Sequence, residues 1–128
     1  LGHDLSSGLL SVGGFPLSLE PLPWMLPAPG QGAIAVETRA GFPSAGWLRV
    51  LHDETTARCV EAERLVLRNL GGGCHLALGA HATATRETLC LRAVFQPVSD
   101  VHRSAEASGP NPESVALDVA SQLLSRDP

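Results

Sequence analysis

The clearest pattern of hydrophobic and polar positions lies in the second half of the chain, where it begins with a helix. Between Asp53 and Leu70 apolar residues recur every three or four positions, as they do on one face of an amphipathic helix. Asp53 is a residue type that caps helix starts, and Gly71 suits the position just after a helix end. The residues expected to face a core are Cys59, Ala62, Val66 and Leu70, extended by Ala57, Val60 and Leu67.

Beyond Cys74 the hydrophobic period changes to two, which is typical of strands that face a core on one side. The short polar link Thr85-Arg86-Glu87 joins two such runs and predicts a β-hairpin. A third strand is expected near residues 101–107. In the first run Leu76, Leu78, Ala80 and Ala82 alternate with Ala77, Gly79, His81 and Thr83, and in the second Leu89, Leu91, Ala93 and Phe95 alternate with Cys90, Arg92, Val94 and Gln96.

A second helix is predicted to start at Asn111-Pro112-Glu113, residue types that suit the N-cap and the first two helical positions. Its apolar stripe comprises Ala116, Val119, Ala120 and Leu123. The order of helix, antiparallel strands and helix predicts an α+β fold, with a small antiparallel sheet of about three strands and helices on one face. We assign residues 53–128 to this C-terminal domain.

The first half of the chain has a different pattern and predicts only a partial α/β segment. Residues 1–29 are rich in Leu, Pro, Gly and Ser, and their prolines exclude a continuous helix over the second half of this range. Such apolar sequence is expected to be covered by other structure, as the tail of a preceding domain or a linker. The glycine turn at residues 30–32 predicts a short buried strand after it, and residues 45–52 predict a short helix that carries Trp47, Leu48 and Leu51.

Composition limits the classes of partner and compartment. The 128 residues carry a net charge of −4, and all nine basic residues are arginine, which argues against nucleic acid as a partner and excludes a Schiff-base lysine within the chain. No apolar run is long enough to cross a membrane, and Leu1 is not followed by the basic region of a signal peptide. Three cysteines are an odd number without a CxxC pair, so we expect a reduced, cytoplasmic protein.

Cys74 is the candidate for chemistry, because it follows Gly71-Gly72-Gly73 between a predicted helix and a predicted strand. A glycine loop can take positive φ angles and present a thiol to a ligand, a metal or an electrophile. The alternative is a small buried hydrophobe, which is what most free cysteines are. Burial is the favoured interpretation for Cys59, on the helix stripe, and for Cys90, within a strand.

Other motifs give weaker hypotheses. A metal site would have to combine Cys74, His75 and His81, with Cys59 as a further candidate ligand. The two histidines lie six apart on a strand and the chain has no tight ligand pair, so we expect no metal. Gly30-Gln31-Gly32 is only part of a nucleotide-binding pattern. Glu61 and Glu63 are expected on a solvated helix edge, and Asp53 is expected to act as a cap.

Three motifs together resemble one family. Leu26-Pro27-Ala28-Pro29-Gly30-Gln31-Gly32-Ala33 is similar to the LPAVGQGA segment of hydroxymethylbilane synthase, also called porphobilinogen deaminase. Ala62-Glu63-Arg64 and Gly71-Gly72-Gly73-Cys74 resemble that family's AER helix and its cysteine loop, and Gly79-Ala80-His81-Ala82 continues the match. The match corresponds to the C-terminal two-fifths of such an enzyme. Residues 30–52 would then be a strand and helix returning to the first of three domains.

The resemblance implies a function. In the family, a transferase of tetrapyrrole (heme) biosynthesis, the loop cysteine forms a thioether to a dipyrromethane cofactor on which four porphobilinogen units are condensed. Cys74 takes the cofactor-anchoring place, and Gln31 is expected to contact a pyrrole carboxylate or ring group. The family's catalytic aspartate and substrate-binding arginines belong to earlier parts of the enzyme, so no catalytic residue is assigned in this chain. The full-length protein is expected to be monomeric and the isolated chain inactive.

This sequence also departs from the family pattern. Gly71 replaces the acidic residue before the double glycine, His75-Leu76-Ala77 replaces Gln-Val-Pro, and residues 3–25 are longer and richer in Gly and Ser. The alternative function is therefore a non-catalytic α+β binding or interaction module, whose apolar segment 1–29 would pack against a partner.

Overall fold

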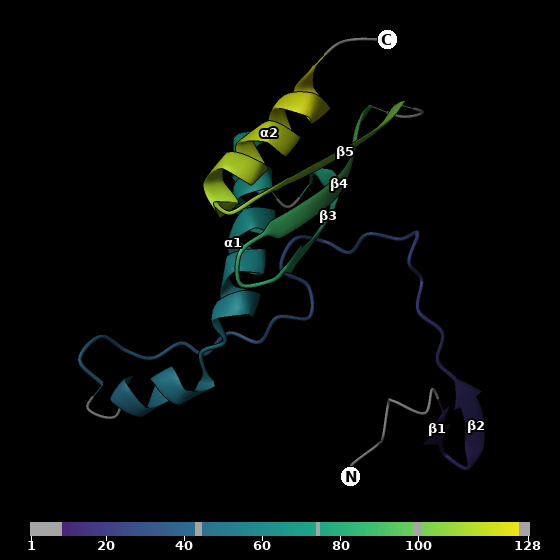
Figure 1. Ribbon diagram of the computed structural model, residues 1–128. Helices are drawn as coiled ribbons and strands as arrows, with labels where there is room; N and C mark the ends of the chain where they lie inside the picture. Colours follow the sequence, from purple (N-terminus) through teal and green to yellow (C-terminus); the bar gives the residue numbers. More distant parts are fainter. Residues whose placement is uncertain (1–8, 43–44, 74, 99–100, 126–128) are drawn as a thin grey trace.

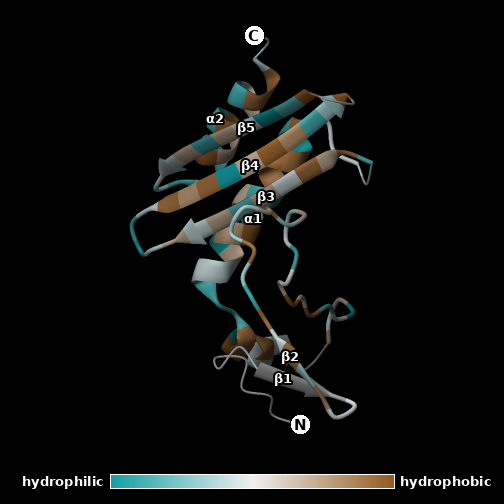
Figure 2. Cartoon of the chain, turned by 90° about the vertical axis from the view of Figure 1, so that its right-hand side faces the viewer, coloured by the Kyte–Doolittle hydropathy of each residue, from teal (hydrophilic) through white to brown (hydrophobic). Residues whose placement is uncertain are grey.

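The computed structural model describes residues 9–42, 45–73, 75–98 and 101–125. Its C-terminal part is a two-layer α+β domain, in which both helices cover one face of a three-stranded antiparallel sheet (Figure 1). The strands lie in the order β3-β4-β5, and in Figure 2 this sheet faces the viewer with the helices behind it. The elements are α1 (Glu54–Asn69), β3 (Ala77–Ala84), β4 (Leu89–Val98), β5 (Val101–Gly109) and α2 (Pro112–Leu124). The predicted fold class is confirmed.

Local chemistry sets the ends of α1 where the sequence predicted them. Asp53 caps the start, because its Oδ1 accepts the Thr56 N–H over 2.7 Å. At the other end Gly71 donates its N–H to Arg68 O and Gly72 donates to the carbonyl five residues before it, over 3.0 and 2.9 Å. These two hydrogen bonds form the Schellman motif, in which a helix ends at a glycine in a left-handed conformation.

The core lies between the sheet and the two helices. Ala80, Ala93 and Ala105 are paired across β3, β4 and β5, and these small side chains let the helices approach the sheet closely. The largest fully buried side chains are Leu89, Leu91, Leu123, Val66, Val115 and Val119. Each contributes on the order of 1.5–3 kcal/mol through removal of apolar surface from water. The predicted stripe of α2 is buried throughout. Of the two alternating sets in the strands, the structure buries Leu78, Ala80, Ala82, Leu89, Leu91, Ala93 and Phe95, and Leu76 is half-buried just before β3.

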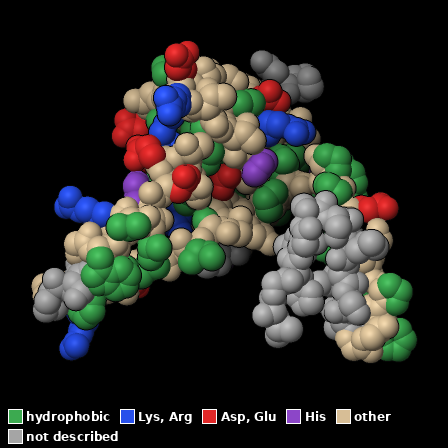
Figure 3. Space-filling view, turned by 60° about the horizontal axis from the view of Figure 1, so that its bottom comes forward, with side chains coloured by type: hydrophobic (Ala, Val, Ile, Leu, Met, Phe, Trp, Pro, Cys, Tyr) green, Lys and Arg blue, Asp and Glu red, His purple; other side chains and the backbone are tan. Residues whose placement is uncertain are grey.

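Residues before Glu54 form little regular structure. A hairpin of β1 (Leu9–Val12) and β2 (Phe15–Ser18) projects away from the domain, and a 3₁₀ helix, η2 (Ala45–Leu51), projects on another side (Figure 1). In Figure 3 hydrophobic side chains gather on the surface of the η2 lobe, where Trp47, Val50 and Leu51 are exposed.

The expected buried strand after residues 30–32 is wrong. Residues 33–39 are coil, and Ile34 is 94% exposed. A strand requires a hydrogen-bonded neighbour, and the described part of the chain pairs none with this segment. Within the same described ranges, no helix has both the length and the apolar character needed to cross a bilayer.

Candidate functional site

The end of α1 delivers a glycine loop to the surface, and Cys74 follows it in the sequence. Gly71 and Gly72 hold φ angles of 99° and 57°, and no described atom would lie within 4 Å of a Cβ at either position. Gly73, at φ 139°, packs against the His75 ring, whose Nε2 would lie 3.1 Å from a Cβ there. Cys74 itself lies outside the described residues. Its sequence neighbours on the helix side form an exposed turn at a helix end.

Gln31 lies in a second glycine turn. Gly30 and Gly32 have φ angles of 74° and 87°, which favour glycine at both positions. Gln31 donates its N–H to the Ala28 carbonyl over 3.0 Å, and its Oε1 accepts the Ala28 N–H over 3.2 Å. The side chain is therefore oriented by its own turn. The chain continues as coil, unlike a dinucleotide-binding turn, which opens a helix.

Residues 26–32, which we call the strap, bind the free edge of β3. Ala80 donates its N–H to the Pro27 carbonyl over 2.8 Å. Gly79 makes room for this approach, because a Cβ there would lie 2.8 Å from the Leu26 carbonyl oxygen. An unpaired strand edge is a template for unwanted pairing. The strap covers this edge and places the Gln31 turn against the domain.

Glu63, a residue of α1, binds both the strap and β3 through its carboxylate. Glu63 is buried, at 6% exposed, and each carboxylate oxygen accepts from its own donor: Gly30 N–H donates to Oε2 over 2.7 Å, and Ala82 N–H donates to Oε1 over 2.8 Å. His81 Nδ1 lies 3.7 Å from Oε1. The prediction that Glu63 lies on a solvated helix edge is wrong, because these backbone donors replace water around the carboxylate. Glu61 is exposed, as predicted.

Two signals in the sequence could have revealed this arrangement. Glu63 lies four residues after Cys59 and three before Val66, which places its carboxylate on the apolar face of α1. A charged residue at such a position needs buried partners. Gly79 interrupts an alternating strand pattern, and a glycine there often marks close approach of another backbone.

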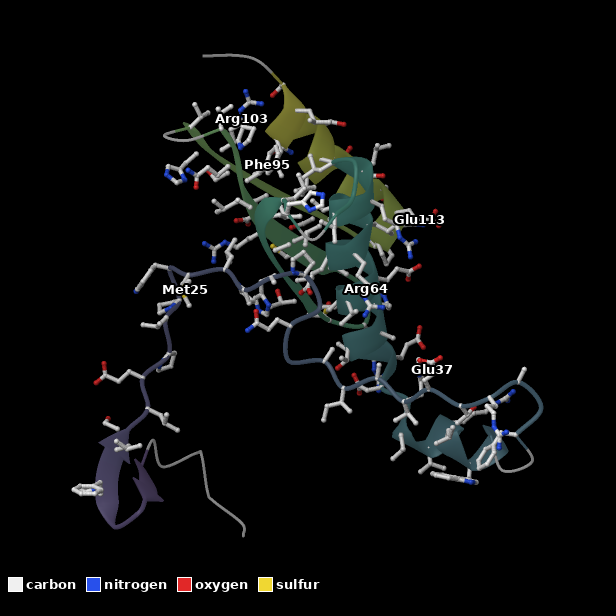
Figure 4. The ribbon with its side chains drawn as sticks, turned by 180° about the vertical axis from the view of Figure 1, so that it is seen from behind. Met25, Glu37, Arg64, Phe95, Arg103 and Glu113 are labelled. Atoms are coloured by element: carbon white, nitrogen blue, oxygen red, sulfur yellow. The ribbon has the colours of Figure 1, made fainter. Side chains whose placement is uncertain are left out.

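A hollow of about 510 Å³ lies between the strap, α1 and β3. Side chains from all three line it, including Gln31, Cys59, Glu63 and His81. Arg64, labelled in Figure 4, lies beside the strap, with its Nε 3.5 Å from the position of a Cβ on Gly30. The hollow borders α1 between Thr55 and Glu63, whereas the glycine loop follows Leu70, about 10 Å further along the helix at 1.5 Å per residue. The Gln31 turn and the glycine loop thus lie at different levels of α1.

The other two cysteines have distinct surroundings, and each is half-buried. Burial, and after it the Glu63 carboxylate, raises the pKa of the Cys59 thiol, which keeps this thiol protonated near neutral pH. Cys90 Sγ lies 3.5 Å from Glu106 Oε1 on the sheet face away from the helices. Across the residues that the structure describes, no three His, Cys, Asp or Glu side chains are grouped as a metal site.

Comparison with known proteins places this domain in a family. Residues 57–125, more than half of the chain, match the family model described as porphobilinogen deaminase, C-terminal domain. Three similar proteins are the porphobilinogen deaminases of Paraburkholderia phymatum (47% identity, covering 77% of this chain and 32% of the relative), Rubrobacter xylanophilus (39%, 94% and 40%) and Listeria monocytogenes (38%, 86% and 37%). The chain spans about a third to two-fifths of the length of these curated relatives. The chain belongs to the porphobilinogen deaminase family, and its residues 57–125 correspond to that family's C-terminal domain.

Proposed function

We propose that this chain is the C-terminal, cofactor-anchoring part of a porphobilinogen deaminase, a transferase that converts porphobilinogen into hydroxymethylbilane. The observation that carries this proposal is the position of Cys74, directly after an exposed glycine loop at the end of α1, in a chain of this family. Residues 53–128 form the anchoring domain, residues 30–52 return to the first domain, and residues 1–29 are the tail of the preceding domain or a linker.

The residues before Cys74 fit a covalent dipyrromethane cofactor. Gly71 and Gly72 leave open space where side chains would stand, and this space suits a bulky adduct. Cys74 would hold the cofactor through a thioether bond, for which the thiol would lose its proton and the amino group of a porphobilinogen-derived unit would leave as ammonia. The thioether bond suits a soft nucleophile such as cysteine. When bound, the cofactor supplies the chain end that four further units extend.

Gln31 enters the proposal as a contact for a pyrrole carboxylate or ring group. Its Oε1 is engaged by the Ala28 N–H, so the amide nitrogen is the group that would donate to a ligand. The separation between this turn and the glycine loop along α1 implies that Gln31 meets an extended pyrrole chain away from its point of attachment.

The catalytic aspartate and the arginines that pair with the acetate and propionate groups are expected in the part of the enzyme that precedes this chain. The nine arginines of this chain include Arg58, which donates to the carbonyls of Thr85, Arg86 and Pro110 and so acts within the fold. We therefore expect the isolated chain to consume no porphobilinogen.

Porphobilinogen consumption by the intact protein tests the proposal. Cys74→Ser should reduce the rate to background, while Cys90→Ser, a matched change of a thiol on the sheet, should leave it close to the unsubstituted rate. Circular dichroism of both variants would show that the fold is retained. Turnover that persists in Cys74→Ser would refute the anchoring role.

The alternative is a non-catalytic binding module, and the exposed apolar residues before Glu54 favour it. Trp24, Ile34 and Val50 are 74%, 94% and 86% exposed, which suits a surface that another protein covers. The coding sequence upstream of Leu1 separates the two functions. An upstream domain with an aspartate and several arginines supports the deaminase, whereas a start codon at this point supports the module.

A further inference from the structure

The strap and β3 are joined by three independent contacts, which together make them one unit. The Pro27 carbonyl accepts a hydrogen bond from the Ala80 N–H, and the Leu26 carbonyl lies so close to Gly79 that a side chain there would clash with it. The Glu63 carboxylate accepts hydrogen bonds from the N–H groups of Gly30 and Ala82. Of these three contacts, only the one from Glu63 is made by a side chain outside the strap and β3. It can therefore be removed by substitution without altering the sequence of the strap or of β3.

The Glu63 bridge joins residues that lie far apart in sequence. Gly30 is 33 positions before Glu63, and Ala82 is 19 positions after it. Gly30 directly precedes Gln31, and Ala82 belongs to the first strand after the Cys74 loop. The carboxylate thus fixes the Gln31 turn relative to the strand that leaves the anchoring loop.

A carboxylate is suited to this place because it accepts two hydrogen bonds and donates none. Both donors are backbone N–H groups, and charge-assisted bonds of this kind are stronger than neutral ones. A glutamine of the same size would offer one acceptor oxygen, and its NH₂ group would point at the other N–H. Size therefore does not explain the residue, whereas charge and acceptor count do.

We propose that Glu63 is a positioning residue, which holds the Gly30-Gln31-Gly32 turn on the edge of β3 and thereby sets where the Gln31 amide meets a bound pyrrole chain. This inference rests on the proposed function for the role of Gln31, but its structural part is independent of activity. Glu63 acts through the turn and does not itself touch the ligand.

Amide hydrogen exchange of this chain tests the structural part. In Glu63→Ala the amides of Gly30 and Ala82 should exchange about 10- to 100-fold faster, because a hydrogen bond to a charged group is worth a factor of this order. In Glu63→Gln one of the two amides should lose protection. The Val119 amide in α2 should be unchanged in both variants, and Glu61→Gln, on the exposed side of the same helix, should change none of them. Unaltered exchange at both Gly30 and Ala82 in Glu63→Ala would overturn the inference.

A double-substitution cycle in the intact protein tests the functional part. Gln31→Ala and Glu63→Gln should each raise KM for porphobilinogen, and the double variant should be no worse than Gln31→Ala alone, because Glu63 acts through Gln31. Glu61→Gln should leave KM unchanged. Independent effects that multiply, or a Gln31→Ala variant with unaltered KM, would contradict the link. An intact protein that consumes no porphobilinogen would reject the proposed function instead, and the exchange data would still decide whether Glu63 holds the turn.

Discussion

The two halves of this chain both contain large apolar side chains, but among the residues that the structure describes only the later half buries them. Every core residue in the described ranges lies at or after Ala62, whereas most of the exposed large hydrophobic residues in these ranges lie at or before Leu51. The later half forms a sheet with two helices over one face, so its apolar stripes meet one another. In the earlier half the described elements leave most such side chains exposed. The strap binds the domain through the hydrogen bond between Ala80 N–H and the Pro27 carbonyl and through the Gly30 N–H, which donates to Glu63.

This difference separates what the domain does for itself from what it offers to other structure. The domain supplies its own core and its own helix caps, and the strap from the earlier half covers the edge of β3. The segments around Trp24, Ile34 and Val50 supply none of these. They are the surface through which we expect the chain to meet the rest of a deaminase.

The largest effect should come from removing the same side chain in each half. Leu91→Ala empties a fully buried position and should cost about 2–5 kcal/mol, whereas Leu51→Ala removes a leucine that is 63% exposed and should change stability by less than about 0.5 kcal/mol. Urea unfolding of this chain, followed by circular dichroism, measures both. Equal destabilisation by the two variants would show that the earlier half also packs into the core.

A smaller effect is expected at the contact between strap and sheet. Gly79→Ala introduces a Cβ 2.8 Å from the Leu26 carbonyl oxygen and should cost about 1–3 kcal/mol, as overpacking does. Gly46→Ala, in η2, is the matched control, since no described atom lies within 4 Å of that Cβ. Proteolysis should cut the strap faster in Gly79→Ala, and equal cutting in both variants would show that the strap does not depend on this close approach.

The contributions of the two helix caps to stability should differ at acidic pH. The backbone N–H of Thr56 lowers the pKa of Asp53 below its usual value, whereas Asn111 caps α2 without a titratable group. Because the pKa is lower in the folded state, the Asp53 contribution is present above the ordinary aspartate pKa and is lost as the pH falls through the folded-state pKa. Asp53→Asn should therefore reduce the loss of stability below about pH 4. Thermal unfolding between pH 2 and 6 measures this loss of stability. Identical pH profiles for the unsubstituted protein and Asp53→Asn would contradict the role of Asp53 as a titrating cap.

The smallest effect concerns the thiols. Burial raises the pKa of Cys59, so less of it is thiolate at pH 7.5 than in an unstructured peptide. Alkylation of Cys59 by iodoacetamide should be slower than that of a short cysteine peptide at this pH, and unfolding in urea should abolish the difference. Reaction of folded Cys59 at the rate of the peptide would show that burial does not control it.

Features set by neighbours in sequence could be predicted, and features set by distant neighbours could not. The cap at Asp53, the glycine end of α1 and the alternation in β3 and β4 each depend on a few adjacent residues, so the sequence predicted all three. The buried strand expected after residues 30–32 rests on apolar residues that follow a glycine turn, and this prediction fails because no described strand pairs with the segment.

The candidate site shows the same division. The glycine loop and Cys74 could be recognised from local sequence and from resemblance to a family. The burial of Glu63 depends on Gly30 and Ala82, which the fold brings together from both sides of α1. No local pattern contains that pairing, although a charge on the apolar face of a helix indicates that some partner must exist.

The measurement that most directly tests the central claim is the mass of the intact protein, followed by peptide mapping of its three cysteines. The account predicts that the protein is heavier than its sequence by one dipyrromethane, that this mass lies on the peptide containing Cys74, and that Cys74→Ser removes it while Cys59 and Cys90 remain unmodified. An active protein with an unmodified Cys74, or with the added mass on another residue, would contradict the account.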